Sequence, residues 1–319
     1  MYVLRIPVIM DLEDARRLHN QLWGLPAWVR HNPAPTPVSL GRADLPVLRR
    51  GYVVTAKTDG ERCTLLVGAA TQDPSRTFAV RFDRTGTATR LGLRRARRVR
   101  LDEDPKADPC EGTLLDCEWV PGRRTFVLLD AMAVCGYDVK PVQDLHRRLA
   151  LGRAAAAAMD LHDAEGPVRV AGKAFLPLSA LDAIDAHGGA DGLVFVPAQA
   201  PIRTGRCTTM FKWKPHHTVD ALWRGGALVF GDKGGFVAAD TVGVVVDPDE
   251  TSSLAVDTVY ELMPLDDVED GAVGTHAVVG PRPDKGAVPN QVDTVHAALL
   301  HGKEGITQGE LARLFASSS

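Results

Sequence analysis

The chain has 319 residues, of which 45% are hydrophobic and 24% charged, and a formal net charge of −3 at pH 7. These values predict a soluble globular protein of one large or two ordinary domains, and they exclude a generally basic nucleic-acid coat while leaving room for a local basic site. The five cysteines form no Cys-x-x-Cys pair and no apolar run is long enough to span a membrane, so we expect an intracellular protein without a disulfide framework or zinc site.

The first half of the chain is dominated by short apolar runs separated by turns. An amphipathic helix is predicted at residues 11–22, and a Pro-rich connector at 32–38. Between residues 50 and 135 the runs follow one another without intervening helices, which predicts an antiparallel sheet rather than βαβ units. The predicted strands are residues 52–56, 64–67, 77–82, 113–119 and 125–132.

Helices and a second β-rich region follow. The apolar pattern predicts helices at residues 145–162 and 179–187, and strands at 193–196 and 209–213. Over residues 218–279, Val-rich strands alternate with Gly-rich turns at a spacing that is typical of a small β-barrel. Two helices are expected at the end, one over residues 291–300 and one after a capping-box pattern formed by Thr307 and Glu310.

The most informative segment is Lys-Thr-Asp-Gly-Glu-Arg at residues 57–62, which directly follows the predicted strand 52–56. A lysine at the end of a strand, with its stem against a core, can act as a nucleophile toward phosphorus. Lysine is also scarce, because the chain has nine lysines and 28 arginines, and a lysine retained under that bias is favoured where a deprotonatable amine is needed. The alternative is a hairpin turn with a surface ion pair.

Two later segments place a carboxylate beside apolar residues. Glu118 lies within the predicted strand 113–119, where a charged side chain is costly unless a cation or a ligand hydroxyl pairs with it. Asp191 stands at the entrance of the predicted strand 193–196. For Glu118 the alternative is a strand with one solvent-exposed face.

Two further segments carry cations. Lys212 and Lys214 are two residues apart, so strand alternation places both ammonium groups on one face and Trp213 on the other. Such a pair repels unless an anion lies between the two groups, and a phosphate fits that place; a solvated edge strand is the alternative. Arg282 and Lys285 lie in the proline-restricted loop Pro-Arg-Pro-Asp-Lys after the β-rich region.

In this order the five segments resemble the covalent nucleotidyltransferase superfamily, which comprises mRNA capping guanylyltransferases and ATP- or NAD-dependent polynucleotide ligases. Finer details are similar to the capping branch, and the resemblance spans about residues 35–300. They are the residues 37–40 ahead of the lysine, the strand 125–131 ending in Asp-Ala, Phe-Lys-Trp-Lys-Pro at 211–215 followed by Thr218-Val219-Asp220, and Pro283-Asp284-Lys285 followed by Pro289-Asn290 and Thr294.

The resemblance implies an α+β fold in two parts. Residues 1–216 would form a nucleotidyltransferase domain built on antiparallel sheets with flanking helices, and residues 217–289 an OB-fold β-barrel lid. The C-terminal helices, within residues 290–316, would pack back on the first domain.

The implied activity is that of an mRNA guanylyltransferase. Lys57 would attack the α-phosphorus of GTP to give a covalent lysyl-GMP, and GMP would then pass to the 5′-diphosphate end of RNA to form the cap. Lys212 and Lys214 would contact the α-phosphate. Asp191 would help to position Mg²⁺ or Mn²⁺, together with Glu118.

The resemblance also assigns nine positions to GTP. Thr58 and Lys173 would contact guanine, Arg62 and Glu118 the ribose, Arg84 a phosphate or the ribose, Phe195 would stack on the base, and Arg282, Asp284 and Lys285 would cover the β- and γ-phosphates. A separate RNA triphosphatase and a cap methyltransferase are expected, RNA polymerase is a further candidate partner, and no membrane is involved. The implied compartment is the nucleus or the cytoplasm of a eukaryotic cell, including one infected by a virus.

One departure from the family pattern leaves other functions open. Gly280 stands where the closing motif usually has an arginine, so the lid would handle the triphosphate with fewer cations. The alternatives to a guanylyltransferase are an ATP-dependent polynucleotide ligase and a non-catalytic module that binds RNA ends or a polymerase.

A run of arginines at residues 94–100 has two interpretations. It contacts the RNA 5′ end electrostatically, or it is a solvated strand face that Asp102, Glu103 and Asp104 balance.

Overall fold

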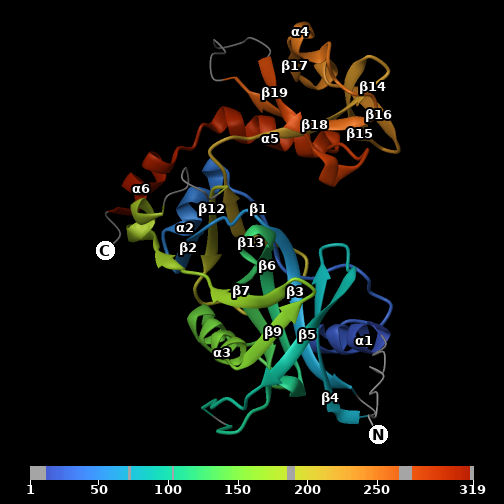
Figure 1. Ribbon diagram of the computed structural model, residues 1–319. Coiled ribbons are helices and arrows are strands. Elements are labelled where there is room, and N and C mark those ends of the chain that lie inside the picture. The colour runs from blue at the N-terminus through green and yellow to red at the C-terminus, as the bar shows by residue number, and fades with distance from the viewer. Residues whose placement is uncertain (1–11, 71–72, 103, 185–190, 266–274, 317–319) are drawn as a thin grey trace, which may run out of the picture. The chain divides into compact units, whose positions relative to one another are not determined.

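The protein, seen here as a computed structural model, is described over residues 12–70, 73–102, 104–184, 191–265 and 275–316. Its fold is α+β and rich in strands (Figure 1). The chain divides into two compact units, and each is treated by itself. The first unit comprises Met1–Val38, Val47–Lys212 and Phe315–Ser319, and the second Ser39–Pro46 and Trp213–Leu314.

The main sheet of the first unit has eight strands in the order β10-β9-β5-β4-β3-β6-β7-β8. Its members are β3 (Glu61–Ala70), β4 (Asp73–Asp83), β5 (Ala88–Ala96), β6 (Thr113–Val120), β7 (Thr125–Val134), β8 (Tyr137–Asp138), β9 (Met159–Asp163) and β10 (Gly166–Gly172). Neighbours in this order pair antiparallel, which confirms the predicted antiparallel pairing for the strands expected at 64–67, 77–82, 113–119 and 125–132. The strand expected at 52–56 belongs to a second sheet. In addition β10 pairs in parallel with β7, so that seven of the strands close a ring.

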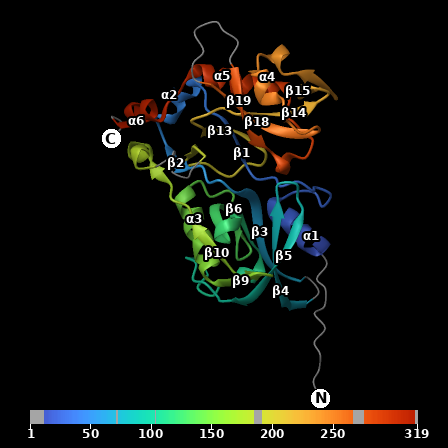
Figure 2. The ribbon, with the colours of Figure 1, turned by 45° about the horizontal axis from the view of Figure 1, so that its top comes forward.

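Both faces of this sheet are apolar because each is covered by a helix. On one side Leu65 and Leu115 share a core cluster with Leu149 of α3 (Leu145–Ala157). On the other side Leu66 packs with Ala15 of α1 (Leu12–Trp23). Adjacent residues of β3 thus point to opposite faces, as strand alternation requires. The two helices lie on different sides of the sheet in both views (Figure 1, Figure 2).

Two of the predicted helices differ in the structure. The helix expected at 145–162 ends at Ala157, because the next residues form β9, with Leu161 directed into the core beside Leu93 of β5. Hydrogen bonding to β5 and β10 therefore overrides the helical pattern. The helix expected at 179–187 is a 3₁₀ segment at Leu178–Ala183, and residues 185–187 lie outside the described residues. The sequence also missed β5 and β10.

A second sheet of the first unit carries the residues around Lys57. Its strand order is β1-β13-β12-β2-β11. The strands are β1 (Thr36–Ser39), β2 (Tyr52–Ala56), β11 (Leu176–Pro177), β12 (Leu193–Pro197) and β13 (Arg206–Trp213), and the short helix α2 (Leu45–Leu48) precedes β2. The antiparallel register of β2 and β12 pairs Ala56 with Leu193, so the end of β2 and the start of β12 lie side by side.

The second unit contains a six-stranded sheet with the order β16-β15-β14-β18-β19-β17. The strands are β14 (Val219–Arg224), β15 (Ala227–Asp232), β16 (Gly235–Ala238), β17 (Val245–Val246), β18 (Thr258–Pro264) and β19 (Thr275–Pro281), with α4 (Pro248–Thr251) after β17. β16 lies at one edge of this sheet, and β17, which follows it in the sequence, pairs in parallel with β19 at the opposite edge. The chain thus brings the two edges toward each other, and the sheet curls toward a barrel. This connectivity is that of an OB-fold and agrees with the predicted small β-barrel.

Two helices follow this sheet, α5 (Val292–Glu304) and α6 (Gln308–Ala316). Val295 of α5 is fully buried in the core of the second unit, with Phe230 and Leu262. The sequence placed residues 290–316 against the first domain, whereas α5 packs within the second unit. No helix of the described ranges is both long and apolar enough to cross a membrane.

Gly152 of α3 marks a close helix-to-sheet contact. A Cβ atom there would lie 3.1 Å from Ala131 Cβ, 3.2 Å from Leu128 Cδ2 and 3.4 Å from Leu115 Cδ2. We expect Gly152→Leu to lower the free energy of unfolding by about 1–3 kcal/mol or more, because an overpacked core forces its neighbours apart. Urea unfolding measures the change.

The matched control is Gly302→Ala in α5, where a Cβ would meet no atom within 4 Å. This substitution should raise stability by up to about 1 kcal/mol, because alanine loses less backbone freedom in a helix than glycine. An unchanged unfolding midpoint for Gly152→Leu would contradict the packing.

Candidate functional site

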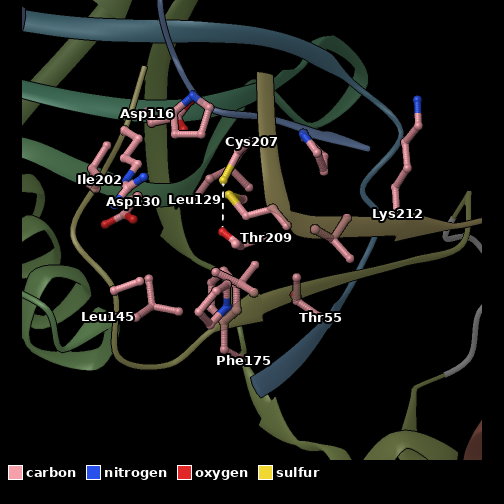
Figure 3. Close-up of a pocket in the computed structure, with 18 of the residues that line it drawn as sticks. Thr55, Asp116, Leu129, Asp130, Leu145, Phe175, Ile202, Cys207, Thr209 and Lys212 are labelled. Carbon is pink, nitrogen blue, oxygen red and sulfur yellow. Dashed lines mark hydrogen bonds between the residues drawn. The ribbon is translucent and has the colours of Figure 1, made fainter. Parts of the chain in front are cut away.

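A cavity of about 530 Å³ lies in the first unit (Figure 3). Its wall comes from β2, β6, β7, β12 and β13 and from the segment 200–204. Figure 3 shows Lys212 at one end of the cavity and Asp130, Ile202 and Leu145 toward the other. The charged side chains that line it are Lys57, Arg62, Asp116, Glu118, Asp130, Arg148, Lys173, Arg203, Arg206 and Lys212.

Lys57 is fixed at the end of β2 by its neighbour β12. Its backbone N–H donates to Gly192 O at 2.8 Å, and its carbonyl accepts from Asp191 N at 2.9 Å. The side chains meet as well, because Lys57 Nζ lies 2.5 Å from Asp191 Oδ2. The two side chains are 26% and 36% exposed, so the ion pair stays open to a ligand. The structure thus joins two residues that are 134 positions apart and that the sequence proposed separately.

The turn after Lys57 requires glycine at position 60. A Cβ on Gly60 would lie 2.7 Å from Trp119 O and 2.8 Å from Glu118 Cγ, which real contacts do not permit. The close approach lays the turn against β6. It explains why a glycine separates Lys57 from the outgoing strand β3, and it places Glu118 next to the lysine-bearing turn.

The floor of the cavity holds two carboxylates opposite each other, the buried Asp116 and the partly buried Asp130. Asp116 of β6 and Asp130 of β7 are register partners, an arrangement in which like charges repel. Arg62 closes on Asp116 with Nε–Oδ1 at 2.6 Å and Nη2–Oδ2 at 2.5 Å. Arg148 closes on Asp130 with two bonds of 2.9 Å. Each carboxylate therefore has its own two-pronged guanidinium partner, the strongest form of ion pair in proteins.

Burial acts on both carboxyls of this floor. Burial raises the pKa of Asp116, and Arg62 opposes the rise. Burial also raises the pKa of Asp130, where Arg148 opposes the rise and the charge of Asp116 adds to it. The sequence missed Asp116, Asp130 and Arg148 as site residues. The signal that could have found Asp116 is a carboxylate inside an apolar strand. We applied this signal to Glu118, but it fits Asp116 better, because Asp116 is only 2% exposed.

Lys173 enters the cavity directly after β10, the strand that closes the ring. It is 8% exposed, and its Nζ donates to Thr58 Oγ1 at 2.6 Å. Arg153 of α3 holds the Lys173 carbonyl at 2.8 Å. Burial lowers the pKa of Lys173 to about 8, against the raising effect of Glu118. Burial in turn raises the pKa of Glu118, and Lys173, Arg62 and Lys57 oppose it. Thr58 and Lys173, which the resemblance assigned to guanine, therefore meet in space.

Three predicted residues are placed differently from the others. Phe195 is fully buried, and its neighbours Val194 and Val196 line the cavity instead. The prediction that Phe195 stacks on a base does not fit this arrangement, because strand alternation turns its ring away. The aromatic residues that line the cavity are Tyr52 and Phe175. Arg84 is exposed at the turn after β4 and Lys214 follows β13; neither lines the cavity, whereas Lys212 does.

The basic loop of the second unit is held by its own carboxylates. Arg282 donates to Asp284 at 2.8 and 2.9 Å and to Asp220 Oδ1 at 3.0 Å. Lys285 Nζ lies 3.2 Å from Asp220 Oδ2. Asp284 raises the pKa of Arg282 further above its usual value. At Gly280 a Cβ would meet no atom within 4 Å, so the packing there leaves space for a larger side chain.

Metal ligation by protein side chains alone finds little support. Over the parts of the chain that the structure describes, no three His, Cys, Asp or Glu side chains are grouped to hold an ion. Glu118 lines the cavity and Asp191 pairs with Lys57 at its wall, and both are hard oxygen donors of the kind that suits an ion also coordinated by a ligand's phosphates.

Comparison with known proteins identifies a family for most of the chain. The family described as "mRNA capping enzyme, catalytic domain" matches residues 8–216. No curated protein sequence matches.

Several solved structures of DNA ligases are similar in part. A mycobacterial DNA ligase D complexed with ATP and MES has 17% sequence identity and a TM-score of 0.43, over 80% of this chain and 97% of that one. The ligase domain of Mycobacterium tuberculosis LigD has 16% identity and a TM-score of 0.37, over 81% and 96%. The ATP-dependent DNA ligase from bacteriophage T7, in complex with ATP, has 10% identity and a TM-score of 0.28, over 78% and 98%. With TM-scores below 0.5, these likenesses carry no argument about activity.

The buried pair under the cavity yields a stability prediction. Arg148→Met leaves the Asp130 carboxylate without its cation and removes the donor to the carbonyls of Gln143 and Ala200. We expect a loss of about 3–5 kcal/mol, because breaking one half of a buried ion pair leaves an uncompensated charge. Urea unfolding tests it.

Two further variants sharpen this measurement. The double variant Asp130→Asn, Arg148→Met should recover part of the loss, since no carboxylate is then stranded. Arg30→Met breaks an exposed pair with Glu13, in which Arg30 is 57% exposed, and should cost less than about 1 kcal/mol. Equal losses for Arg148→Met and Arg30→Met would contradict the assignment.

Lys173 yields a prediction about pH. Its ammonium should titrate near pH 8 in NMR spectra of ¹³C-labelled lysine side chains. Between that value and 10.5, where an unperturbed lysine titrates, the unfolded chain binds the proton and the folded chain does not, so Lys173 makes the free energy of unfolding rise with pH. Glu118→Gln should move the pKa of Lys173 below 8, because the negative charge of Glu118 raises that pKa.

The control for this titration is Asp59→Asn, which removes an equal charge from an exposed position in the neighbouring turn. A Lys173 titration that stays near pH 10.5 in the wild-type protein would refute the buried environment.

Proposed function

Because the chain belongs to the family of mRNA capping enzyme catalytic domains, we propose that it is an mRNA guanylyltransferase. In this proposal the protein is a covalent nucleotidyltransferase that takes GMP from GTP and delivers it to the 5′-diphosphate end of RNA. The observation that carries the proposal is the Lys57–Asp191 pair at the wall of a cavity lined by further cations.

The first step is attack by Lys57 Nζ on the α-phosphorus. The N–P bond forms, the bond from phosphorus to the bridging oxygen breaks, and pyrophosphate leaves with the bonding electrons. A lysine must lose a proton to react in this way. Asp191 Oδ2, 2.5 Å from Nζ, is placed to accept that proton and to keep the amine aimed into the cavity.

Charge in the transition state is met by cations of the same cavity. Lys212 lines it together with Lys57, and an ammonium beside the α-phosphate stabilises the negative charge that builds there. We assign Lys214 to the same phosphate, as the next outward residue along the chain. Asp116 binds Arg62 through Nε and Nη2 and so fixes its guanidinium at the cavity. In this proposal the guanidinium and Glu118 orient the ribose. Arg84 stays a proposed phosphate or ribose contact.

Selection of guanine rests on Lys173 and Thr58. Lys173 Nζ is an N–H donor held in place by Thr58 Oγ1, and guanine offers a carbonyl acceptor at the position where adenine has an amino donor. The cavity therefore favours GTP over ATP. If ATP were the better substrate, the chain would act as a polynucleotide ligase, which the labelling experiment below decides.

A divalent ion would be held by Asp191 and Glu118 together with the phosphates of GTP. Magnesium and manganese both accept such oxygen donors. The ion would neutralise phosphate charge during the transfer. In the second unit, Arg282, Asp284 and Lys285 would meet the β- and γ-phosphates, for which Arg282 and Lys285 must loosen their ion pairs with Asp220.

The reaction sequence implies partners. The RNA acceptor needs a 5′-diphosphate, so a separate RNA triphosphatase must supply it, and a cap methyltransferase would act on the product. RNA polymerase is a further proposed partner.

Labelling at Lys57 is the test. Incubation with radiolabelled GTP and Mg²⁺ should give a protein band that stays labelled on a denaturing gel, and mass spectrometry should find one GMP on the Lys57 peptide. Labelled ATP should give much less. Lys57→Arg should lower labelling by at least about 10³-fold, because a guanidinium stays protonated.

Lys106→Ala is the matched control, since this lysine is exposed and outside the cavity. It should label as the wild type does. Wild-type protein that incorporates no GMP while its Lys57 peptide is detected would overturn the guanylyltransferase, and stronger labelling by ATP would replace it with a ligase.

A further inference from the structure

The segment 88–100 presents an unusually uniform surface. Its exposed side chains are Thr89 and six arginines, and every other residue of the segment is partly buried. The arginine strip comprises Arg90, Arg94, Arg95, Arg97, Arg98 and Arg100. In a chain of net charge −3, six cations within 13 residues are a strong local departure.

The strip is held on a fixed backbone. Leu91, Leu93, Ala96 and Val99 pack against the core of the first unit, which directs the arginines outward. The register of β5 against β9 shifts between Leu93 and Arg95, and this bulge allows two adjacent arginines to be exposed. Beyond β5, Arg97 N donates to Ala158 O at 2.9 Å and Val99 N to Ala107 O at 2.8 Å. The cations are therefore presented in line rather than on a free loop.

The acidic residues that were predicted to balance the run engage elsewhere. Asp102 lies 3.7 Å from Arg147 Nη2, and Asp104 accepts from Lys106 N and Tyr137 OH. Glu103 lies outside the described residues. Among the residues the structure describes, none forms an ion pair with the strip, although Asp160 is the register partner of Arg95. The strip is solvated as that interpretation requires, but Asp102 and Asp104, both among the described residues, form no ion pair with its arginines.

We propose that the arginine strip binds the phosphate backbone of the RNA whose 5′ end is to be modified. The proposal rests on the guanylyltransferase function proposed above, which requires an RNA acceptor. Outward side chains on a strand recur about every 7 Å, so the strip offers a linear series of cations. An extended polyanion fits such a series, and each phosphate that it binds releases counterions.

The chemistry of the strip favours an RNA backbone over other partners. Its exposed part has no aromatic or aliphatic anchor, which a peptide groove or a membrane-inserting surface would have. Contacts of this kind read no base sequence. The strip thus holds RNA of any sequence and raises the occupancy of the acceptor at low ionic strength.

The test is binding of RNA by a strip variant. The triple variant Arg94→Gln, Arg95→Gln, Arg97→Gln is compared with the wild type by fluorescence anisotropy, using a 3′-labelled single-stranded RNA of about 20 nucleotides with a 5′-diphosphate. The affinity should fall by at least about 10-fold at low salt. The slope of log K against log salt should become shallower by about 2, at about 0.7 per lost phosphate contact.

The matched control is Arg49→Gln, Arg50→Gln, Arg123→Gln, which removes the same charge from exposed positions outside the strip. It should bind RNA nearly as well as the wild type. An unchanged affinity and slope in the strip variant would overturn the proposal, and so would equal losses in the control, since only net charge would then matter. A strip variant that loses binding of a phosphorylated acidic peptide but keeps RNA binding would overturn it in favour of a protein partner.

Labelling with GTP on the same samples separates this proposal from the proposed function. If the wild type forms no lysyl-GMP but the strip variant still loses RNA affinity and salt slope, the guanylyltransferase fails and the RNA-binding surface stands. If the wild type forms lysyl-GMP and the strip variant binds RNA as the wild type does, the surface fails and the enzyme stands.

Discussion

Two carboxylates that face each other across β6 and β7 set the main constraint on this structure. Asp116 and Asp130 cannot be buried as neighbouring charges without compensation, and each is closed by a guanidinium from a different element. Arg62 ties β3 to β6, and Arg148 ties α3 to β7 and to the carbonyl of Ala200. The two ion pairs that neutralise the floor of the cavity therefore also hold the surrounding strands and α3 in place.

The charges around Lys57 form a second group, distinct from that floor. Since Asp116 and Asp130 are each neutralised, the balance near Lys57 is decided by Asp191 and Glu118 on the acidic side, and by Lys173 and Lys212 on the basic side. Such a mixture suits a nucleotide, because the triphosphate requires cations while the sugar and base require both donors and acceptors. The family match and the geometry lead to the same class of chemistry.

Much of the site followed from short segments, because strand ends and alternation are local. The sequence singled out Lys57, Asp191, Glu118 and Lys212, and the family resemblance assigned Thr58 and Lys173 to the same base. It did not foresee the Arg148–Asp130 pair, since nothing local tells which arginine of α3 faces β7. The predicted stacking of Phe195 on a base does not fit its full burial, because the sequence of a strand that is buried on both faces does not show which side chains line a cavity. The helix expected at 145–162 was too long, since β9 depends on hydrogen bonds to distant strands.

The parallel pairing of β10 with β7 has an effect beyond placing Lys173. Arg169 to Gly172 hydrogen-bond alongside Thr125 to Leu128, so the last strand of the curled sheet is covered by another strand instead of facing water. Open strand edges are templates on which a second chain can dock and start an aggregate. Closing the ring therefore removes one edge on which another chain could add a strand.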